Sequence, residues 1–175
     1  MTLGQDRDRI TRVVAAAIGV ALVAALLVQA RPAGGHGGVL PARLSFFAEP
    51  DGAVEVTPAA PRALLESGPL RPGDGATGTL RLRNQTGSRL AVGLRAEPSS
   101  TALDGLVEVR LVSGGQVLAD TTLQALRRGT PGRLRLAPGA AASVRVIASL
   151  PAEVVTGYEG RDVTVNLIPT DGQGR

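Results

Sequence analysis

The chain contains no cysteine and no lysine, and its only aromatic side chains are Phe46, Phe47 and Tyr158. Without thiols it forms no disulfide, no zinc–thiolate site and no cysteine nucleophile. Because aromatic rings are so few, a folded core must be built from leucine, valine, isoleucine and alanine. A large aliphatic side chain contributes roughly 1.5–3 kcal/mol when it is fully buried. A two-layer domain is therefore feasible within the 175 residues.

Histidine is almost as scarce as the aromatic residues. The single histidine, His36, lies in the glycine-rich stretch 33–38, so a Ser-His-Asp triad in a core is excluded. The acidic residues are scattered without the spacing of a calcium loop, and the aromatic platforms typical of sugar hydrolases are missing. These absences predict a protein that is not an enzyme, with no catalytic residues, no metal and no cofactor. A hydrolase whose carboxylates meet only in the fold is the weakest alternative.

Arginine supplies all 19 positively charged side chains, against 15 Asp and Glu, for a formal net charge of +4 and a pI of 11.1. The pI overstates electrostatic attraction, because arginine stands wherever another protein would use lysine. Seven arginines on the polar faces of predicted strands form a candidate basic surface for an anionic envelope polymer. They are Arg81, Arg83, Arg95, Arg110, Arg133, Arg135 and Arg145. No aromatic residues interleave with them to stack on bases, which disfavours nucleic acid as a partner.

The N-terminal segment has the parts of a secretory signal peptide. Arg7, Arg9 and Arg12 precede the uncharged run Val13–Val28, and small residues at the −3 and −1 positions predict cleavage after Ala30. The arginines are never adjacent, which favours a Sec-type signal over a twin-arginine signal. An uncleaved anchor is the alternative, although a spanning helix needs about 20 apolar residues. Either reading predicts export, with membrane contact only through residues 1–30.

After a linker rich in glycine and proline (31–43), short segments alternate apolar with polar residues at intervals typical of an all-β domain. We expect strands at 44–48, 53–57, 79–83, 90–96, 106–112, 116–119, 133–136, 143–150 and 162–168. A helical turn is expected at 63–66 within a proline-rich loop, and a short helix or connector at 121–127. Asn84-Gln85-Thr86 matches a glycosylation sequon, but a tight turn explains it equally well.

Two similar turns, Leu70-Arg71-Pro72-Gly73 and Leu136-Ala137-Pro138-Gly139, each precede an alternating segment. Proline fixes φ at the first turn position and glycine accepts the positive φ that follows. One-sided alternation predicts an antiparallel two-sheet sandwich over residues 44–170, followed by a tail at 171–175. The strand count fits a jelly roll, with an immunoglobulin-like sandwich as the alternative.

Several motifs in order resemble the TasA and camelysin (CalY) family of exported bacterial surface proteins. They are the Leu70-Arg71-Pro72-Gly73-Asp74 turn, the strand 78–84 with its Asn-x-Thr-Gly turn, the strand 106–111, the turn at 136–139, Ser149-Leu150-Pro151, Gly157-Tyr158-Glu159-Gly160 and Gln173. The resemblance spans roughly residues 44–173. The chain departs from the family in its lack of lysine, its short central region and its glycine-rich linker.

The resemblance implies a jelly roll that builds extracellular matrix fibres, in which an N-terminal strand completes the sheet of the neighbouring subunit. The donor strand would lie within residues 39–48, at Leu44, Ser45, Phe46 and Phe47. Camelysin is described as a metalloprotease, but no HExxH motif is present here, so protease activity is not carried over.

The sequence therefore predicts a cell-surface or biofilm-matrix structural protein that associates with itself or with other surface proteins. The main alternative is a monomeric envelope-associated binding or accessory domain held near the membrane.

Overall fold

The computed structural model describes residues 40–171, which contain ten strands and one short helix. The predicted signal peptide, its cleavage site at Ala30 and most of the linker lie outside the described residues. The elements are β1 (Arg43–Ala48), β2 (Val54–Thr57), β3 (Leu65–Glu66), β4 (Gly75–Asn84), β5 (Leu90–Pro98), β6 (Glu108–Ser113), β7 (Gln116–Thr122), α1 (Leu123–Leu126), β8 (Leu134–Leu136), β9 (Ala141–Ser149) and β10 (Asp162–Asp171).

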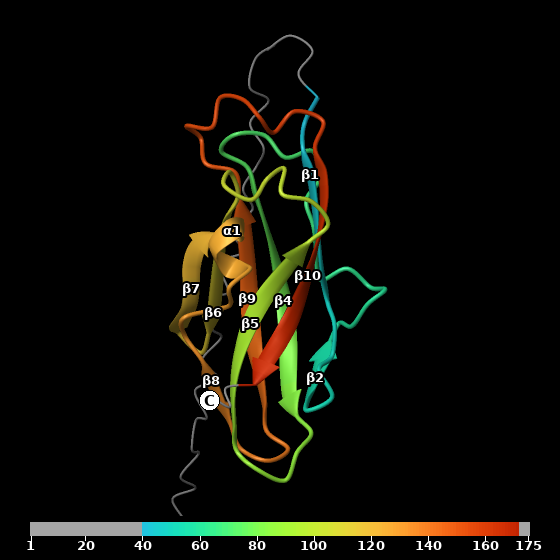
Figure 1. Ribbon diagram of the computed structural model, residues 1–175, viewed down its shortest axis with the longest axis vertical. Coiled ribbons are helices and arrows are strands. Elements are labelled where there is room, and N and C mark those ends of the chain that lie inside the picture. The colour runs from blue at the N-terminus through green and yellow to red at the C-terminus, as the bar shows by residue number, and fades with distance from the viewer. Residues whose placement is uncertain (1–39, 172–175) are drawn as a thin grey trace, which may run out of the picture. The chain divides into compact units, whose positions relative to one another are not determined.

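The strands form two five-stranded sheets that face each other across one core (Figure 1). The first sheet has the order β3-β1-β10-β5-β8 and the second has the order β2-β4-β9-β6-β7. In β4, Leu80 and Leu82 are fully buried, whereas Thr79, Arg81 and Arg83 face solvent. This alternation is what one buried sheet face requires. The predicted two-sheet β-sandwich is confirmed.

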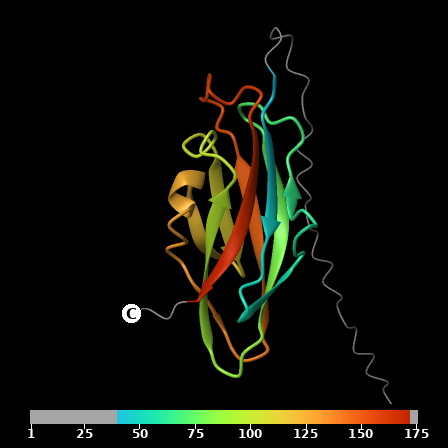
Figure 2. The same ribbon diagram turned by 45° about the vertical axis from the view of Figure 1, so that its right-hand side comes forward.

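Eight of the strands pair in a nested order: β1 with β10, β4 with β9, β5 with β8, and β6 with β7. Successive strands repeatedly cross between the two sheets, as in a jelly roll. One pair departs from the predicted antiparallel arrangement, because β1 runs parallel to β10 (Figure 2). Segment 58–70 runs antiparallel to β1 and returns the chain to the end of the sandwich where β1 begins. The next long strand, β4, begins at that same end. The first sheet is therefore mixed.

The returning segment contains β3 rather than the helical turn expected at 63–66, and that expectation is wrong. Leu65 pairs with Phe46, and the Leu64 N–H donates to the Phe46 carbonyl oxygen at 2.7 Å. Leu64, Leu65 and Leu70 are buried here. An extended segment satisfies the second edge of β1 along its length, which a local helical turn does not do.

The two Leu-x-Pro-Gly turns close opposite ends of the ladder between β4 and β9. Gly73 and Gly139 have φ values of +89° and +69°, which glycine accepts without a Cβ clash. The Gly73 N–H donates to Leu150 O at 2.7 Å, and the Gly139 N–H donates to Asn84 O at 3.1 Å. The first turn precedes β4 and is hydrogen-bonded to the residue that follows β9. The second turn precedes β9 and is hydrogen-bonded to the last residue of β4. The sequence repeat thus corresponds to a repeated structural role.

The core is aliphatic, as the composition predicts. Phe46 is its one fully buried ring and Tyr158 is 8% exposed.

The short helix expected within 121–127 is present as α1, and Thr122 caps it by accepting from Ala125 N at 3.3 Å. Ala42, assigned by the sequence to the linker, is fully buried and bridges to Leu70. Within residues 40–171 there is no helix long and apolar enough to cross a bilayer.

Candidate functional site

The segment proposed as a donor strand forms β1, an interior strand of the first sheet. Leu44 and Phe46 point into the core and are fully buried, together with Ala48. Ser45 and Phe47 lie on the outer face and are half-buried. Burial of three alternating side chains makes β1 part of the core.

Both edges of β1 are hydrogen-bonded. On one side it pairs in parallel with β10, in a register that places Ser45 opposite Thr164 and Phe47 opposite Asn166. On the other side Leu44 is bonded twice to Ser67: the Leu44 N–H donates to Ser67 Oγ at 2.8 Å, and the Ser67 N–H donates to Leu44 O at 2.8 Å. Within a single chain, β1 therefore fills a slot between β10 and the returning segment.

The seven arginines of the candidate basic surface lie on both sheets. Arg81, Arg83, Arg110 and Arg145 lie on the outer face of the second sheet. Arg95 and Arg135 lie on β5 and β8 of the first sheet, and Arg133 directly precedes β8. Three of the seven pair with carboxylates. They are Arg83 with Glu55 at 3.9 Å, Arg110 with Asp120 at 3.7 Å, and Arg95 with Glu97.

The described part of the chain is close to electrically neutral. Residues 40–171 carry fourteen arginines and thirteen carboxylates, a net charge of +1. Most of the formal charge of +4 thus comes from residues outside 40–171. The charge of the sandwich as a whole gives little attraction to a polyanion, so recognition of an anion would have to come from a local arrangement.

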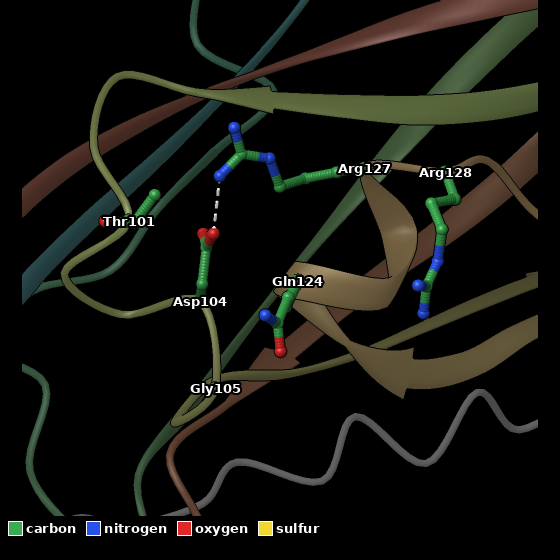
Figure 3. Close-up of a pocket in the computed structure, with 6 residues that line it drawn as sticks. All are labelled: Thr101, Asp104, Gly105, Gln124, Arg127 and Arg128. Carbon is green, nitrogen blue, oxygen red and sulfur yellow. Dashed lines mark hydrogen bonds and ion pairs between the residues drawn. The ribbon is translucent and has the colours of Figure 1, made fainter.

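Such an arrangement occurs beside α1, where a cavity of about 490 Å³ is lined by Thr101, Asp104, Gly105, Gln124, Arg127 and Arg128 (Figure 3). The Asp104 side chain is only 8% exposed, and its Oδ2 accepts a hydrogen bond from Arg127 Nη1 at 2.6 Å. Arg127 itself is 43% exposed. The pair joins the loop between β5 and β6 to the end of α1.

Backbone hydrogen bonds fix the cavity wall. The Asp104 N–H donates to Thr101 O at 3.2 Å, and the Gln124 N–H donates to Asp104 O at 2.9 Å. Leu103 and Leu123 are fully buried beneath them. The side chains of Asp104 and Gln124 are thus presented by anchored backbone.

The sequence did not single out this cavity. Asp104 and Arg127 lie 23 positions apart, and no motif or periodicity connects them. The cavity contains one carboxylate, so it lacks the carboxylate pair of glycoside hydrolases. Among residues 40–171 no group of three or more His, Cys, Asp or Glu side chains is placed to hold a metal ion.

The sequon residue Asn84 is fully buried. Its Nδ2 donates to the carbonyl oxygens of Ser88 at 2.7 Å, Leu136 at 3.2 Å and Ala137 at 3.1 Å. Its Oδ1 accepts from the N–H of Thr86 at 2.8 Å. In the folded chain this amide is occupied by structural hydrogen bonds, which accounts for the sequon without a glycan.

These features define an all-β sandwich whose first described strand lies inside a sheet and which has a cavity with charged residues on its flank. No protein-family model and no curated protein matches the chain. Among solved structures, a similar chain is described as the structure of the N-terminal domain of PorA. The two are 12% identical with a TM-score of 0.28, and the alignment covers 77% of this chain and 91% of that chain. A likeness this weak carries no functional argument.

Proposed function

We propose that the protein is an exported, non-enzymatic structural protein of the cell surface or extracellular matrix, and that its subunits join by exchange of β1. The observation that carries this proposal is the position of β1. It is the first strand of the described chain, yet it occupies an interior slot with both edges bonded and three side chains in the core.

An identical strand from a second copy makes the same contacts in the same slot. Exchange of an identical element is a low-cost route to association, because no new complementary surface is needed. Extended peptides bind sheets in this way through main-chain hydrogen bonds, with specificity from alternate side-chain pockets. Here those pockets hold Leu44, Phe46 and Ala48.

Each copy donates one β1 and offers one slot, so the contact is heterologous. Such contacts form rings where the rotation closes and open filaments where it does not. The resemblance to the TasA and camelysin family supports the filament. The arginine-flanked apolar run at 13–28 supports export.

The test is electron microscopy and light scattering of the purified protein, with a synthetic peptide of residues 40–48 as competitor. We expect fibres that shorten as the peptide fills the slots of exposed ends. A matched peptide with aspartate at the position of Phe46 should have no effect, because a charge does not enter the core. Monomers at every concentration, or fibres indifferent to both peptides, would contradict strand exchange.

A second candidate is a monomeric envelope-associated binding domain. The observation that favours it is the cavity beside Asp104, because a binding module needs a concave site with a few placed polar groups. Monomers at every concentration in the experiment above would shift the proposal to this function.

A further inference from the structure

The lining of the cavity beside α1 combines groups that bind anions with groups that bind hydroxyls. Arg127 uses Nη1 to bind Asp104, while Arg128 makes no ion pair with any residue in 40–171. Within the same range, the side chains of Gln124 and Thr101 make no hydrogen bond that meets ordinary distance criteria. Two guanidiniums against one carboxylate give the cavity a net positive charge.

Asp104 supplies a second observation. Its Oδ2 is bound to Arg127, but its Oδ1 is buried and accepts no hydrogen bond from the described protein groups. Buried polar atoms in native proteins almost always have a partner, so each exception calls for an explanation. An acceptor in this position is complemented by a hydroxyl donor, and the adjacent guanidiniums are complemented by an anion.

We propose that this cavity binds one acidic saccharide unit, a sugar that carries both hydroxyls and a carboxylate. The carboxylate pairs with Arg128, whose guanidinium lies on the other side of Gln124 from the Asp104–Arg127 pair (Figure 3). The free N–H groups of Arg127 donate to a hydroxyl oxygen of the sugar. A hydroxyl donates to Asp104, and Gln124 bonds a second hydroxyl. Because Oδ1 is covered in this structure, binding includes a small rearrangement of the Asp104–Arg127 pair that opens this oxygen to the ligand.

The size and composition of the cavity fit this ligand class. Its volume of about 490 Å³ lies within the range of roughly 300–1,000 Å³ found for small-molecule sites. No aromatic side chain lines it, which disfavours a nucleobase or another flat ring as ligand. Without an aromatic side chain for the sugar ring to stack on, we expect a dissociation constant on the order of 1 mM for a single unit. This inference goes beyond the proposed structural role and does not depend on strand exchange.

The experiment is a ¹H–¹⁵N NMR titration of the purified protein with D-glucuronate, with D-glucose and inorganic phosphate as separate arms. We expect saturable shifts at the amides of Gly105, Gln124 and Arg127 with glucuronate, and binding at least about tenfold weaker for glucose, which lacks the carboxylate. Phosphate, which has no hydroxyl framework, should also bind about tenfold more weakly.

Arg128→Gln should weaken glucuronate binding about tenfold, since it removes a charged bidentate donor from an exposed position. Arg145→Gln, an exposed arginine on the second sheet, is the matched control and should leave the affinity unchanged. The proposal is overturned if glucuronate produces no saturable shifts up to about 50 mM. It is equally overturned if phosphate binds as tightly, which would show a simple anion site, or if Arg128→Gln binds as the wild type does.

Discussion

The side-chain amide of Asn84 donates a hydrogen bond to the carbonyl oxygen of Leu136, 3.2 Å away and 52 positions later in the chain. The same nitrogen bonds the carbonyl oxygen of Ala137, inside the second Leu-x-Pro-Gly turn. One buried amide therefore ties the end of β4 to the turn that starts β9. It also links the second sheet to β8, because Leu136 is the last residue of that strand.

Replacement of this amide should lower the stability of the fold substantially. We expect Asn84→Ala to lower the free energy of unfolding by about 2–4 kcal/mol, because buried carbonyls lose their donor. Denaturant unfolding measures the change. Gln85→Ala is the control, because the partner of Gln85 is the exposed Glu55 and such contacts contribute at most about 1 kcal/mol. Equal losses in the two variants would contradict the role assigned to Asn84.

Alanine substitution of the equivalent glycines in the two repeated turns should lower stability by similar amounts. Both have positive φ, so Gly73→Ala and Gly139→Ala should each destabilise the protein by about 1–2 kcal/mol. Gly87→Ala provides the comparison: no atom lies within 4 Å of its would-be Cβ and its φ is not positive. That variant should be neutral or slightly stabilising. A Gly87 variant as unstable as the other two would show that φ is not the cause.

The sequence predicts those parts of the fold that depend on local pattern. Alternation in segments such as 79–83 marks which side chains enter the core, and proline–glycine pairs mark the turns. Pairings between distant segments leave no such mark. The parallel neighbours β1 and β10 begin at Arg43 and Asp162, and nothing in either segment encodes the direction of the other. The two-residue β3 is likewise defined by β1 rather than by its own residues.

In the candidate sites, too, local pattern identifies the elements, whereas the contacts between distant segments are not visible in the sequence. Leu44 to Phe47 are recognisable as a strand, but their interior position follows from the returning segment. The Asp104–Arg127 pair arises where a loop meets α1, so its 23-residue separation contains no periodic signal. Asn84 is recognisable as a turn residue, whereas its three carbonyl partners come from the tertiary fold.

Alanine substitutions at the two neighbouring phenylalanines of β1 should differ sharply in their effect on stability. Phe46 is fully buried and Phe47 lies half-buried on the outer face. Phe46→Ala should cost about 3–5 kcal/mol through lost burial and the cavity left behind, and Phe47→Ala should cost less than about 1.5 kcal/mol. Thermal or urea unfolding compares them. A reversed order would mean that β1 presents its other face to the core.

Close packing of segment 58–70 on β4 predicts a further effect. A Cβ at Gly78 would overlap the carbonyl oxygen of Leu64 and lie 3.0 Å from the Leu65 Cβ. Gly78→Ala should therefore destabilise the protein by about 1–3 kcal/mol, because backbone must move. Gly68→Ala, in open space on the same segment, should change stability by less than about 0.5 kcal/mol. Similar values for the two variants would argue against this packing.

The central claim, that β1 joins one subunit to the next, is tested most directly by a disulfide between β1 and β10. The chain has no cysteine of its own, and Ser45 and Thr164 are register partners on the outer face. Neighbouring strands lie about 4.7–4.9 Å apart, within the range of Cα separations that a disulfide spans. The double variant Ser45→Cys/Thr164→Cys is oxidised and separated by non-reducing electrophoresis.

Thr79→Cys/Arg145→Cys, a register pair between β4 and β9, is the control and should give only monomers. Strand exchange predicts a ladder of covalent oligomers for the β1–β10 pair, which reduction collapses to a single band. Complete oxidation within single chains, with no ladder at any protein concentration, would contradict the account.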